Sequence, residues 1–128
     1  MSDGLKRLPD SELEIMKALW AADEPLTRPQ LEVALQHKQW ASTTVLGLVA
    51  RLEAKGFVER HKQGRGYLIR AAVSEAEYLP VESRSALERM FEGSAKNLIA
   101  ALHQCDALTR QDVEELADYL AKLEQEVK

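Results

Sequence analysis

The chain has 128 residues, of which 45% are hydrophobic and 30% are charged, and its formal net charge is −4. A chain of this length can bury one modest core and carry an appendage. No apolar stretch approaches the roughly 20 residues that a membrane-spanning helix needs. The first residues lack the apolar segment of a signal peptide, so we expect a cytoplasmic protein. Cys105 is the only cysteine, which excludes an internal disulfide and a paired-cysteine metal motif.

The charge is distributed unevenly along the chain. Residues 1–70 contain 11 Lys/Arg and 9 Asp/Glu, whereas residues 71–128 contain 6 and 12. Within residues 38–70 there are 7 basic residues against 2 acidic ones. Phosphate binding responds to a local patch more than to the net charge. Residues 38–70 are therefore a candidate nucleic-acid surface, and we expect the acidic second half of the chain to lie away from DNA.

Two helices are predicted before this basic segment. The first spans about 10–22, where Ser11 and Glu14 have the spacing of a capping box. Its apolar stripe consists of Leu13, Met16, Leu19 and Trp20. The second helix begins at Thr27, with Gln30 three residues on, and ends near 36–38. Its inward side chains are predicted to be Leu31, Ala34 and Leu35.

A third helix and a β-hairpin follow. Within residues 42–55 the apolar side chains recur at helical spacing and form one buried face, made of Val45, Leu48, Val49 and Leu52. Gly56 can adopt the left-handed conformation that ends a helix. Residues 57–70 predict two strands around the turn at 63–66, a β-hairpin "wing" with a basic tip. We therefore predict a mainly α fold with a small wing, a winged helix-turn-helix.

The other face of the third helix is small and polar at its start and basic toward its end. Short side chains let a helix approach the base edges of a DNA major groove, and cations meet the phosphates. Arg28 lies at the start of the second helix, where the helix N-terminus favours a phosphate. The candidate DNA-binding residues are Arg28, Ser42, Thr43, Thr44, Leu46, Gly47, Arg51, Lys62 and Arg65.

Each of these residues also has a plainer interpretation. The serine and threonines at the start of the third helix can be caps, and Ser42 is the first that could serve, since Ala41 cannot. Leu46 can touch a thymine methyl group or pack against the neighbouring helix. Arg51 can contact a phosphate or pair with Glu12 or Glu14. The basic side chains of the wing can simply be solvated.

Residues 73–128 are predicted to form a helical dimerisation region, following a DNA-binding domain over residues 1–72. Ser74 and Glu77 have capping-box spacing, but Pro80 predicts a bend or a later start for a helix that runs to about 104. This helix carries an apolar stripe that includes Leu87, Phe91, Leu98 and Leu102.

A last helix opens at Thr109 and Asp112, which again have the spacing of a cap. Its apolar residues are spaced by three and four along one stripe, and they are Val113, Leu116, Leu120, Leu123 and Val127. Two helices cannot bury both stripes on each other alone, and exposed stripes of this size mark an interface. We therefore predict a symmetric dimer, which a palindromic DNA site requires.

Three stretches of the sequence match one known family. The first, Leu8 to Trp20, contains Glu12, Ile15-Met16 and Leu19-Trp20. The second, Trp40 to Gly56, contains Thr44-Val45, Leu48, Arg51-Leu52 and Lys55-Gly56. The third contains Glu77-Tyr78, Gly93-Ser94 and Leu108-Thr109 to Leu116. In these stretches the chain resembles the penicillinase repressor family (BlaI/MecI type) of bacterial winged-helix regulators.

The resemblance implies a homodimer that binds a palindromic operator in double-stranded DNA and represses transcription, as regulators of β-lactam resistance genes do. Some family members are inactivated by a cut at Asn-Phe that a membrane sensor protease triggers. This chain has Ala101-Leu102 there, which speaks against such a partner. A copper-responsive branch carries paired Cys-x-Cys motifs, which a lone Cys105 excludes. Some members have lysine and arginine where this chain has Thr43 and Leu46, which predicts a different operator.

No catalytic motif is present, because the sequence lacks a Gly-rich phosphate loop, HExxH and GxSxG. We therefore expect no enzyme, no catalytic or metal site and no cofactor. The alternative to a DNA-binding repressor is a winged-helix protein-interaction module that docks a partner through its C-terminal helices and does not bind DNA. The net charge of −4 favours this alternative, and the basic segment at 38–70 speaks against it.

Overall fold

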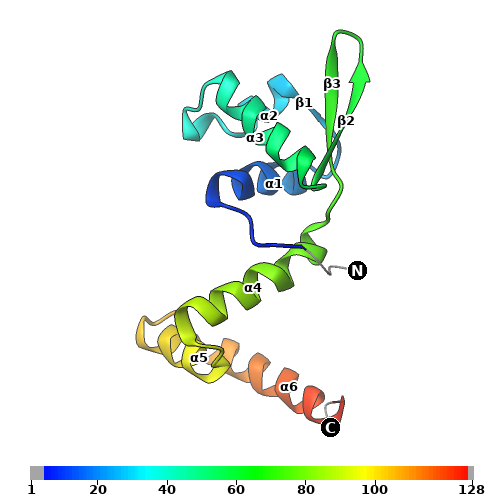
Figure 1. Cartoon of the computed structure of the whole chain (residues 1–128). Coiled ribbons are helices and arrows are strands. Elements are labelled where there is room, and N and C mark those ends of the chain that lie inside the picture. Colours follow the sequence, from blue (N-terminus) through cyan, green and yellow to red (C-terminus); the bar gives the residue numbers. More distant parts are fainter. Residues whose placement is uncertain (1–4, 127–128) are drawn as a thin grey trace. The chain divides into compact units, whose positions relative to one another are not determined.

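The computed structural model describes residues 5–126 and divides into two compact units, residues 1–83 and residues 84–128. We call the described parts of these the winged-helix unit (5–83) and the C-terminal unit (84–126). The winged-helix unit contains α1 (Asp10–Ala22), β1 (Leu26–Thr27), α2 (Arg28–Ala34), a 3-10 turn η1 (Gln36–Lys38), α3 (Ser42–Ala54), β2 (Val58–Gln63), β3 (Gly66–Ala71) and the first part of α4 (Glu75–Phe91). The prediction of a mainly α fold with a wing is confirmed (Figure 1).

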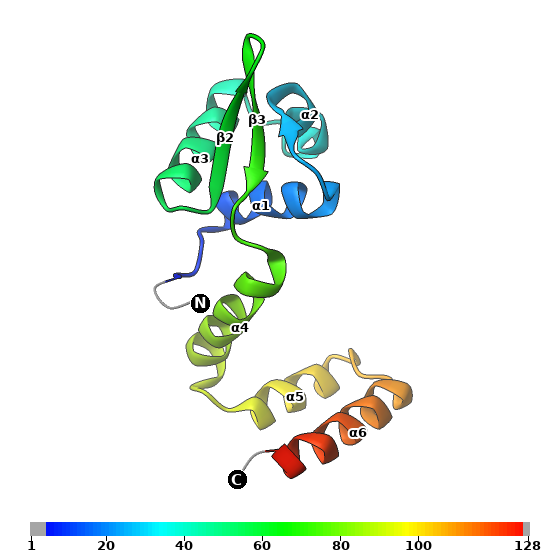
Figure 2. The same cartoon turned by 90° about the vertical axis from the view of Figure 1, so that its right-hand side faces the viewer.

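The sheet has three antiparallel strands in the order β1-β3-β2. Leu26 of β1 pairs with Ile69, and Gln63 pairs with Gly66 at the far end of the hairpin. The turn contains Gly64 with a φ of 60°, a conformation that glycine adopts at no steric cost. The hairpin projects beyond the helices as the predicted wing, which Figure 2 shows from the side. The two-residue strand β1 was not predicted.

The core of the winged-helix unit joins all its helices to the sheet. Its fully or nearly buried side chains are Leu8, Ile15, Met16, Leu19, Leu31, Leu35, Val45, Leu48, Val49, Leu52, Phe57, Val58, Ile69, Val73 and Tyr78. The predicted buried face of α3 is therefore confirmed. The prediction that Ala34 points inward is wrong, because α2 ends there and leaves it exposed.

The capping predictions had mixed outcomes. Thr27 and Gln30 form the expected capping box, with each side chain bonded to the other residue's backbone N–H. The predicted box of Ser11 and Glu14 is wrong, because α1 begins at Asp10 with Pro9 at its N-cap and no side-chain cap bond.

The start of α4 belongs to the winged-helix unit. Ser74 and Glu77 form the expected capping box, so the helix begins at Glu75 and the later start predicted from Pro80 is wrong. Tyr78 lies fully buried, with its ring 5.9 Å from that of Trp20 and 5.8 Å from that of Phe57. This aromatic cluster fixes the first turns of α4 to the core.

The C-terminal unit consists of the end of α4, α5 (Ala95–Gln104) and α6 (Arg110–Glu126). The prediction of a single helix up to about 104 is wrong, because the helix is interrupted at Glu92 and Gly93, which have φ values of 50° and 85°. Ser94 then caps α5 by accepting a hydrogen bond from the Asn97 backbone N–H. Thr109 and Asp112 cap α6 as predicted, and Val127 lies outside the described residues.

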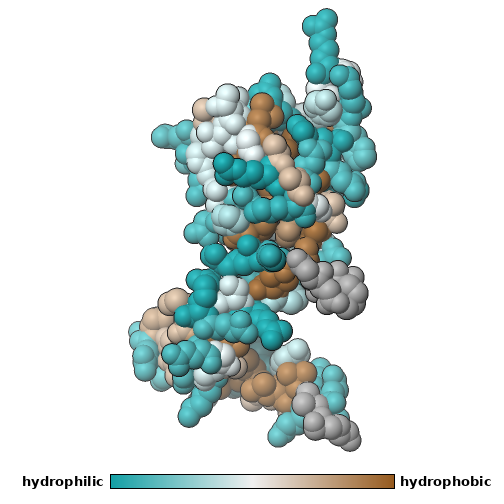
Figure 3. Space-filling view, in the orientation of Figure 1, coloured by the Kyte–Doolittle hydropathy of each residue, from teal (hydrophilic) through white to brown (hydrophobic). Residues whose placement is uncertain are grey.

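No residue of the C-terminal unit is buried between 84 and 126. Figure 3 accordingly shows apolar side chains open on the surface of these helices. Most predicted interface residues are half-buried, namely Leu87, Phe91, Leu98, Leu102, Leu116 and Leu123, whereas Val113 and Leu120 are exposed. Met90, Ile99 and Tyr119 add further exposed apolar surface. Among the described residues, no helix has the length and apolarity to cross a bilayer.

Candidate nucleic-acid interface

The face of α3 that was predicted to meet DNA is open to solvent. Its residues Ser42, Thr43, Thr44, Leu46, Gly47 and Arg51 are all exposed. A Cβ placed on Gly47 would meet no atom within 4 Å, so none of residues 5–126 blocks close approach at this position. Leu46 is 39% exposed and borders the hollow between α3 and the wing, which leaves its side chain free to contact a ligand.

A hollow of about 710 Å³ separates the helices from the wing. It is bordered by Thr27, Arg28, Pro29, Leu46, Arg60, Gln63, Arg65, Gly66, Tyr67 and Ile69. Three arginines line this concave surface, of which Arg28 and Arg60 pair with carboxylates and Arg65 forms no ion pair among the described residues, so Arg65 is the one that can attract a DNA phosphate. The structure thus brings together three of the predicted residues, from α2, α3 and the wing.

The start of α3 is tied to α2 by a carboxylate. Glu32 accepts hydrogen bonds from the hydroxyl of Ser42 and from Nη1 of Arg28, both at 2.7 Å. Arg28 Nη1 also lies 3.2 Å from Ser42 Oγ. The Ser42 hydroxyl, followed by the Arg28 guanidinium, lowers the pKa of Glu32 below its ordinary value. The suggestion that Ser42 caps α3 is wrong, since Ala41 is the N-cap and no side chain caps the helix.

The wing is fixed to the end of α3 through Arg60. Its guanidinium donates two hydrogen bonds to Glu53 Oε1, at 2.7 and 3.0 Å, and lies 5.3 Å from the centre of the Tyr67 ring. Lys62 Nζ lies 5.7 Å from the centre of the same ring. Tyr67 is 45% exposed, so an aromatic side chain in contact with two cations lies on the wing surface. Neither Glu53 nor Tyr67 was predicted from the sequence to be a site residue.

Several basic side chains form ion pairs with carboxylates of the same protein. Lys55 Nζ lies 2.5 Å from the buried carboxylate of Glu12, so Glu12 is not the partner of Arg51 that one interpretation suggested. Arg70 pairs with Glu59 on the wing. Among residues 5–126, the basic side chains of the predicted set that form no ion pair are those of Arg51, Lys62 and Arg65. These three are available for phosphates.

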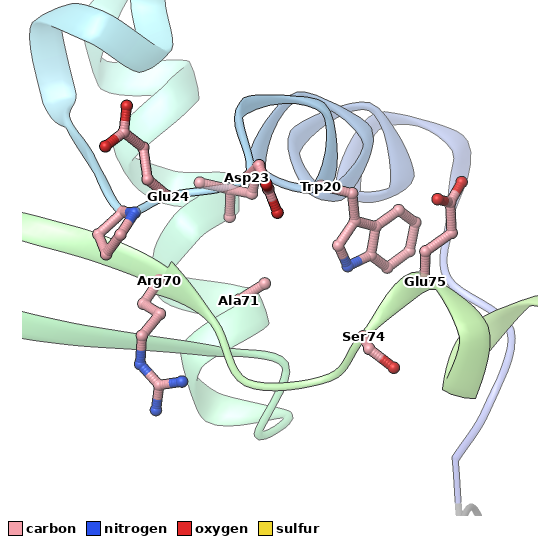
Figure 4. Close-up of a pocket in the computed structure, with 9 residues that line it drawn as sticks. Trp20, Asp23, Glu24, Arg70, Ala71, Ser74 and Glu75 are labelled. Carbon is pink, nitrogen blue, oxygen red and sulfur yellow. The ribbon is translucent and has the colours of Figure 1, made fainter.

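A second hollow of about 420 Å³ lies beside the end of α1 and the base of the wing. Figure 4 shows that its charged side chains, including Glu24, Arg70 and Glu75, point away from one another rather than toward a common centre. The indole N–H of Trp20 donates to the Val73 carbonyl at 2.9 Å, which is a structural bond. A ligand site needs convergent polar groups, so this hollow is a weaker candidate than the α3–wing surface.

No cluster of three or more potential metal ligands occurs within the described part of the chain. Cys105 is exposed at the end of α5, with its Sγ 3.5 Å from the Leu102 carbonyl oxygen.

The exposed polar face of α3 beside a basic wing defines a winged helix-turn-helix protein of the DNA-binding class. The sequence model of the family described as penicillinase repressor matches residues 8–122. The chain therefore belongs to the penicillinase repressor family, a family of transcriptional repressors. This membership confirms the resemblance and the expectation that the chain is not an enzyme.

Individual relatives agree with this assignment. The chain is 28% identical over 119 residues to a penicillinase repressor of Bacillus licheniformis, covering 91% of this chain and 93% of the relative. It is 23% identical over 122 residues to the methicillin resistance regulatory protein MecI of Staphylococcus aureus, covering 95% and 99%.

Solved structures show the same fold. A solution structure of monomeric BlaI from Bacillus licheniformis, in complex with the blaP half-operator, has a TM-score of 0.50 and 26% identity, covering 59% of this chain and 92% of that one. A mutant of MepR from Staphylococcus aureus has a TM-score of 0.50 at 19% identity, covering 94% and 80%, and shows similarity of fold alone.

Proposed function

We propose that this protein is a homodimeric repressor that binds a palindromic operator with one winged helix on each half-site. The observation that carries this proposal is the exposed α3 face, where Thr43, Thr44 and Gly47 leave room for base edges. Side chains this short allow a helix to reach the floor of the major groove. Leu46 is suited to contact a thymine methyl group. The BlaI structure with its half-operator supports the same use of the winged-helix unit.

The unpaired cations supply the phosphate contacts in this proposal. Arg51 lies on α3, and Lys62 and Arg65 lie on the wing, so the contacts would come from the inserted helix and from the wing beside it. A dimer that neutralises about six phosphates should show a log–log salt dependence of affinity with a slope of about −5. A slope near zero would contradict the electrostatic part of the proposal.

The dimer is proposed from the C-terminal unit. Helices with no buried residue and with Val113, Tyr119 and Leu120 more than half exposed need a partner to cover them. A second copy with the same stripe meets this need by two-fold symmetry and at the same time matches a palindromic site.

The proposed targets are genes of the kind that the relatives' names indicate, penicillinase and methicillin resistance. Because the ligand is bacterial DNA, the proposed place of action is the cytoplasm. A sensor protease is not part of the proposal, since Ala101-Leu102 replaces the expected cleavage pair.

The decisive experiment is selection of binding sites from fragmented genomic DNA, with the mass of the protein measured in the same buffer. Enrichment of a dyad sequence by a dimer supports the proposal, and the neighbouring genes identify the regulon. A protein that enriches no fragment, even at low salt, would instead be the protein-interaction module.

A further inference from the structure

Glu32 lies among the residues that are proposed to face DNA, although a carboxylate there repels phosphates. Its side chain is 28% exposed, and its Oε2 atom accepts both the Arg28 and the Ser42 hydrogen bonds. The carboxylate therefore engages two side chains that the sequence predicted to contact DNA, one on α2 and one on α3.

The pair with Glu32 changes what Arg28 can do. A guanidinium whose charge is compensated at 2.7 Å contributes little to counterion release when DNA approaches. To bind a phosphate, Arg28 would have to leave Glu32 and place the bare carboxylate beside the DNA backbone. On non-operator DNA, where only phosphate contacts are gained, the ion pair between Arg28 and Glu32 should therefore remain intact.

The bond with Glu32 also fixes the polarity of Ser42. A serine hydroxyl has one hydrogen to donate and two lone pairs to accept. The hydrogen is used on Glu32, and one lone pair accepts a hydrogen bond from Arg28 Nη1 at 3.2 Å. The exposed oxygen at the first residue of α3 can therefore accept one further hydrogen bond but cannot donate one. Amino groups of cytosine and adenine in the major groove can donate to such an oxygen, whereas phosphate oxygens cannot.

We propose that Glu32 is a specificity-determining residue, which lowers affinity for non-operator DNA by neutralising Arg28 and favours operator DNA by holding Ser42 as a hydrogen-bond acceptor. Glu32 acts through these two residues and is therefore a positioning residue. The inference rests on the proposed DNA-binding function and adds how the interface rejects incorrect DNA. Such rejection through a repulsive group is a general means of achieving specificity.

The first test replaces Glu32 by glutamine and measures binding to a short mixed-sequence duplex as salt is varied. Glu32→Gln frees one Arg28 per protomer, so the log–log salt slope of the dimer should become steeper by about 2. Between about 50 and 200 mM salt, the loss of affinity should grow by roughly tenfold. Glu24→Gln is the matched control, because Glu24 is exposed, forms no ion pair among the described residues and gives the same change in net charge.

A double variant separates this proposal from a plain phosphate contact. Arg28→Ala combined with Glu32→Gln removes the pair as a neutral unit, so its salt slope should equal that of the unaltered protein. If Arg28 contacts a phosphate in spite of Glu32, the double variant should have a slope flatter by about 2, and the proposal is overturned.

The second readout is discrimination, measured as the ratio of affinities for an enriched genomic fragment and for the mixed-sequence duplex. Glu32→Gln should lower this ratio by roughly fivefold, the value of one modest base contact. If Glu32→Gln has the same salt slope and the same affinity ratio as Glu24→Gln, the inference is overturned, whatever the thermal stability of the variant. The proposed function would still stand in that case. An unaltered protein that binds neither duplex overturns both.

Discussion

Tyr78 offers a direct test of how the winged-helix unit is held together. Its hydroxyl accepts a hydrogen bond from the backbone N–H of Leu8 at 2.7 Å and donates one to Glu82 Oε1 at 2.6 Å. One side chain thus joins the segment before α1 to the second turn of α4. Tyr78→Phe keeps the ring and its contacts with Trp20 and Phe57 but removes both hydrogen bonds.

The loss can be estimated from burial. Leu8 is 1% exposed, so its N–H would stay buried without an acceptor, at a cost of about 1–3 kcal/mol. Glu82 also pairs with Arg7 at 3.2 Å and its side chain is 25% exposed, so solvent and Arg7 replace most of its lost bond. We expect a total of about 2–3 kcal/mol. For a unit of this size that corresponds to a fall in Tm of roughly 10–20 °C.

The assay is urea unfolding at a fixed protein concentration, because a dimer's stability depends on concentration. Tyr67→Phe is the control, since Tyr67 is 45% exposed and its hydroxyl makes no hydrogen bond within the described residues. The control should change stability by less than about 0.5 kcal/mol. A Tyr78→Phe effect as small as that of the control would refute the reasoning.

The same residue predicts a dependence on alkaline pH. Burial, followed by the hydrogen bond to Glu82, raises the pKa of Tyr78 to about 12. The folded-state pKa lies above the unfolded value of about 10, so the neutral phenol contributes stability below pH 10 that is lost as pH rises through 12. The difference in stability between the unaltered protein and Tyr78→Phe should therefore narrow over this range.

Four further substitutions test the core, the interface and the dimer. Lys55→Ala should lower the free energy of unfolding in urea by about 2 kcal/mol, because it leaves the buried Glu12 carboxylate unpaired. The partial exposure of Lys55 keeps this value low. A change within experimental error would contradict the role of Lys55. Arg65→Ala should weaken binding to all duplexes alike and flatten the salt slope by about 2 in fluorescence anisotropy titrations, whereas Thr44→Val should change the ranking of operator variants. Leu120→Lys should shift the mass measured by light scattering toward the monomer, and an unchanged dimer would remove the α6 stripe from the interface.

The winged-helix unit was largely predictable because its signals are local. The spacing of apolar residues predicts α3, and the glycine turn predicts the wing; each signal lies within a short stretch of sequence. The strand β1 was missed because two residues carry no period, and they become a strand only by pairing with Ile69 and Leu68 of β3.

The break between α4 and α5 was missed for a different reason. Leu87, Phe91, Leu98 and Leu102 keep helical spacing across it, so the apolar pattern alone predicts a continuous helix. Gly93-Ser94, noted above only as part of the family match, is the signal for the break, because a left-handed glycine is followed by an N-cap.

The candidate site was predictable in its exposed residues but not in its internal partners. Once the helical spacing of apolar residues identifies the buried face of α3, the remaining positions must form its outward face. The pairs of Glu53 with Arg60 and of Glu12 with Lys55 depend on side-chain geometry, and the second joins residues 43 positions apart. Arg28 and Glu32, by contrast, are four residues apart on one helix, a spacing that could have indicated their pair. The number of available cations could therefore not be obtained by counting basic residues.

The residues proposed to contact bases have little part in folding. Within residues 5–126, the side chains of Thr43 and Thr44 make no hydrogen bond and are exposed, and Gly47 has open space around it. Substitutions at such positions usually change stability by less than about 0.5 kcal/mol. Operator preference can therefore diverge among descendants of this protein through single substitutions, without first requiring compensating changes in the core.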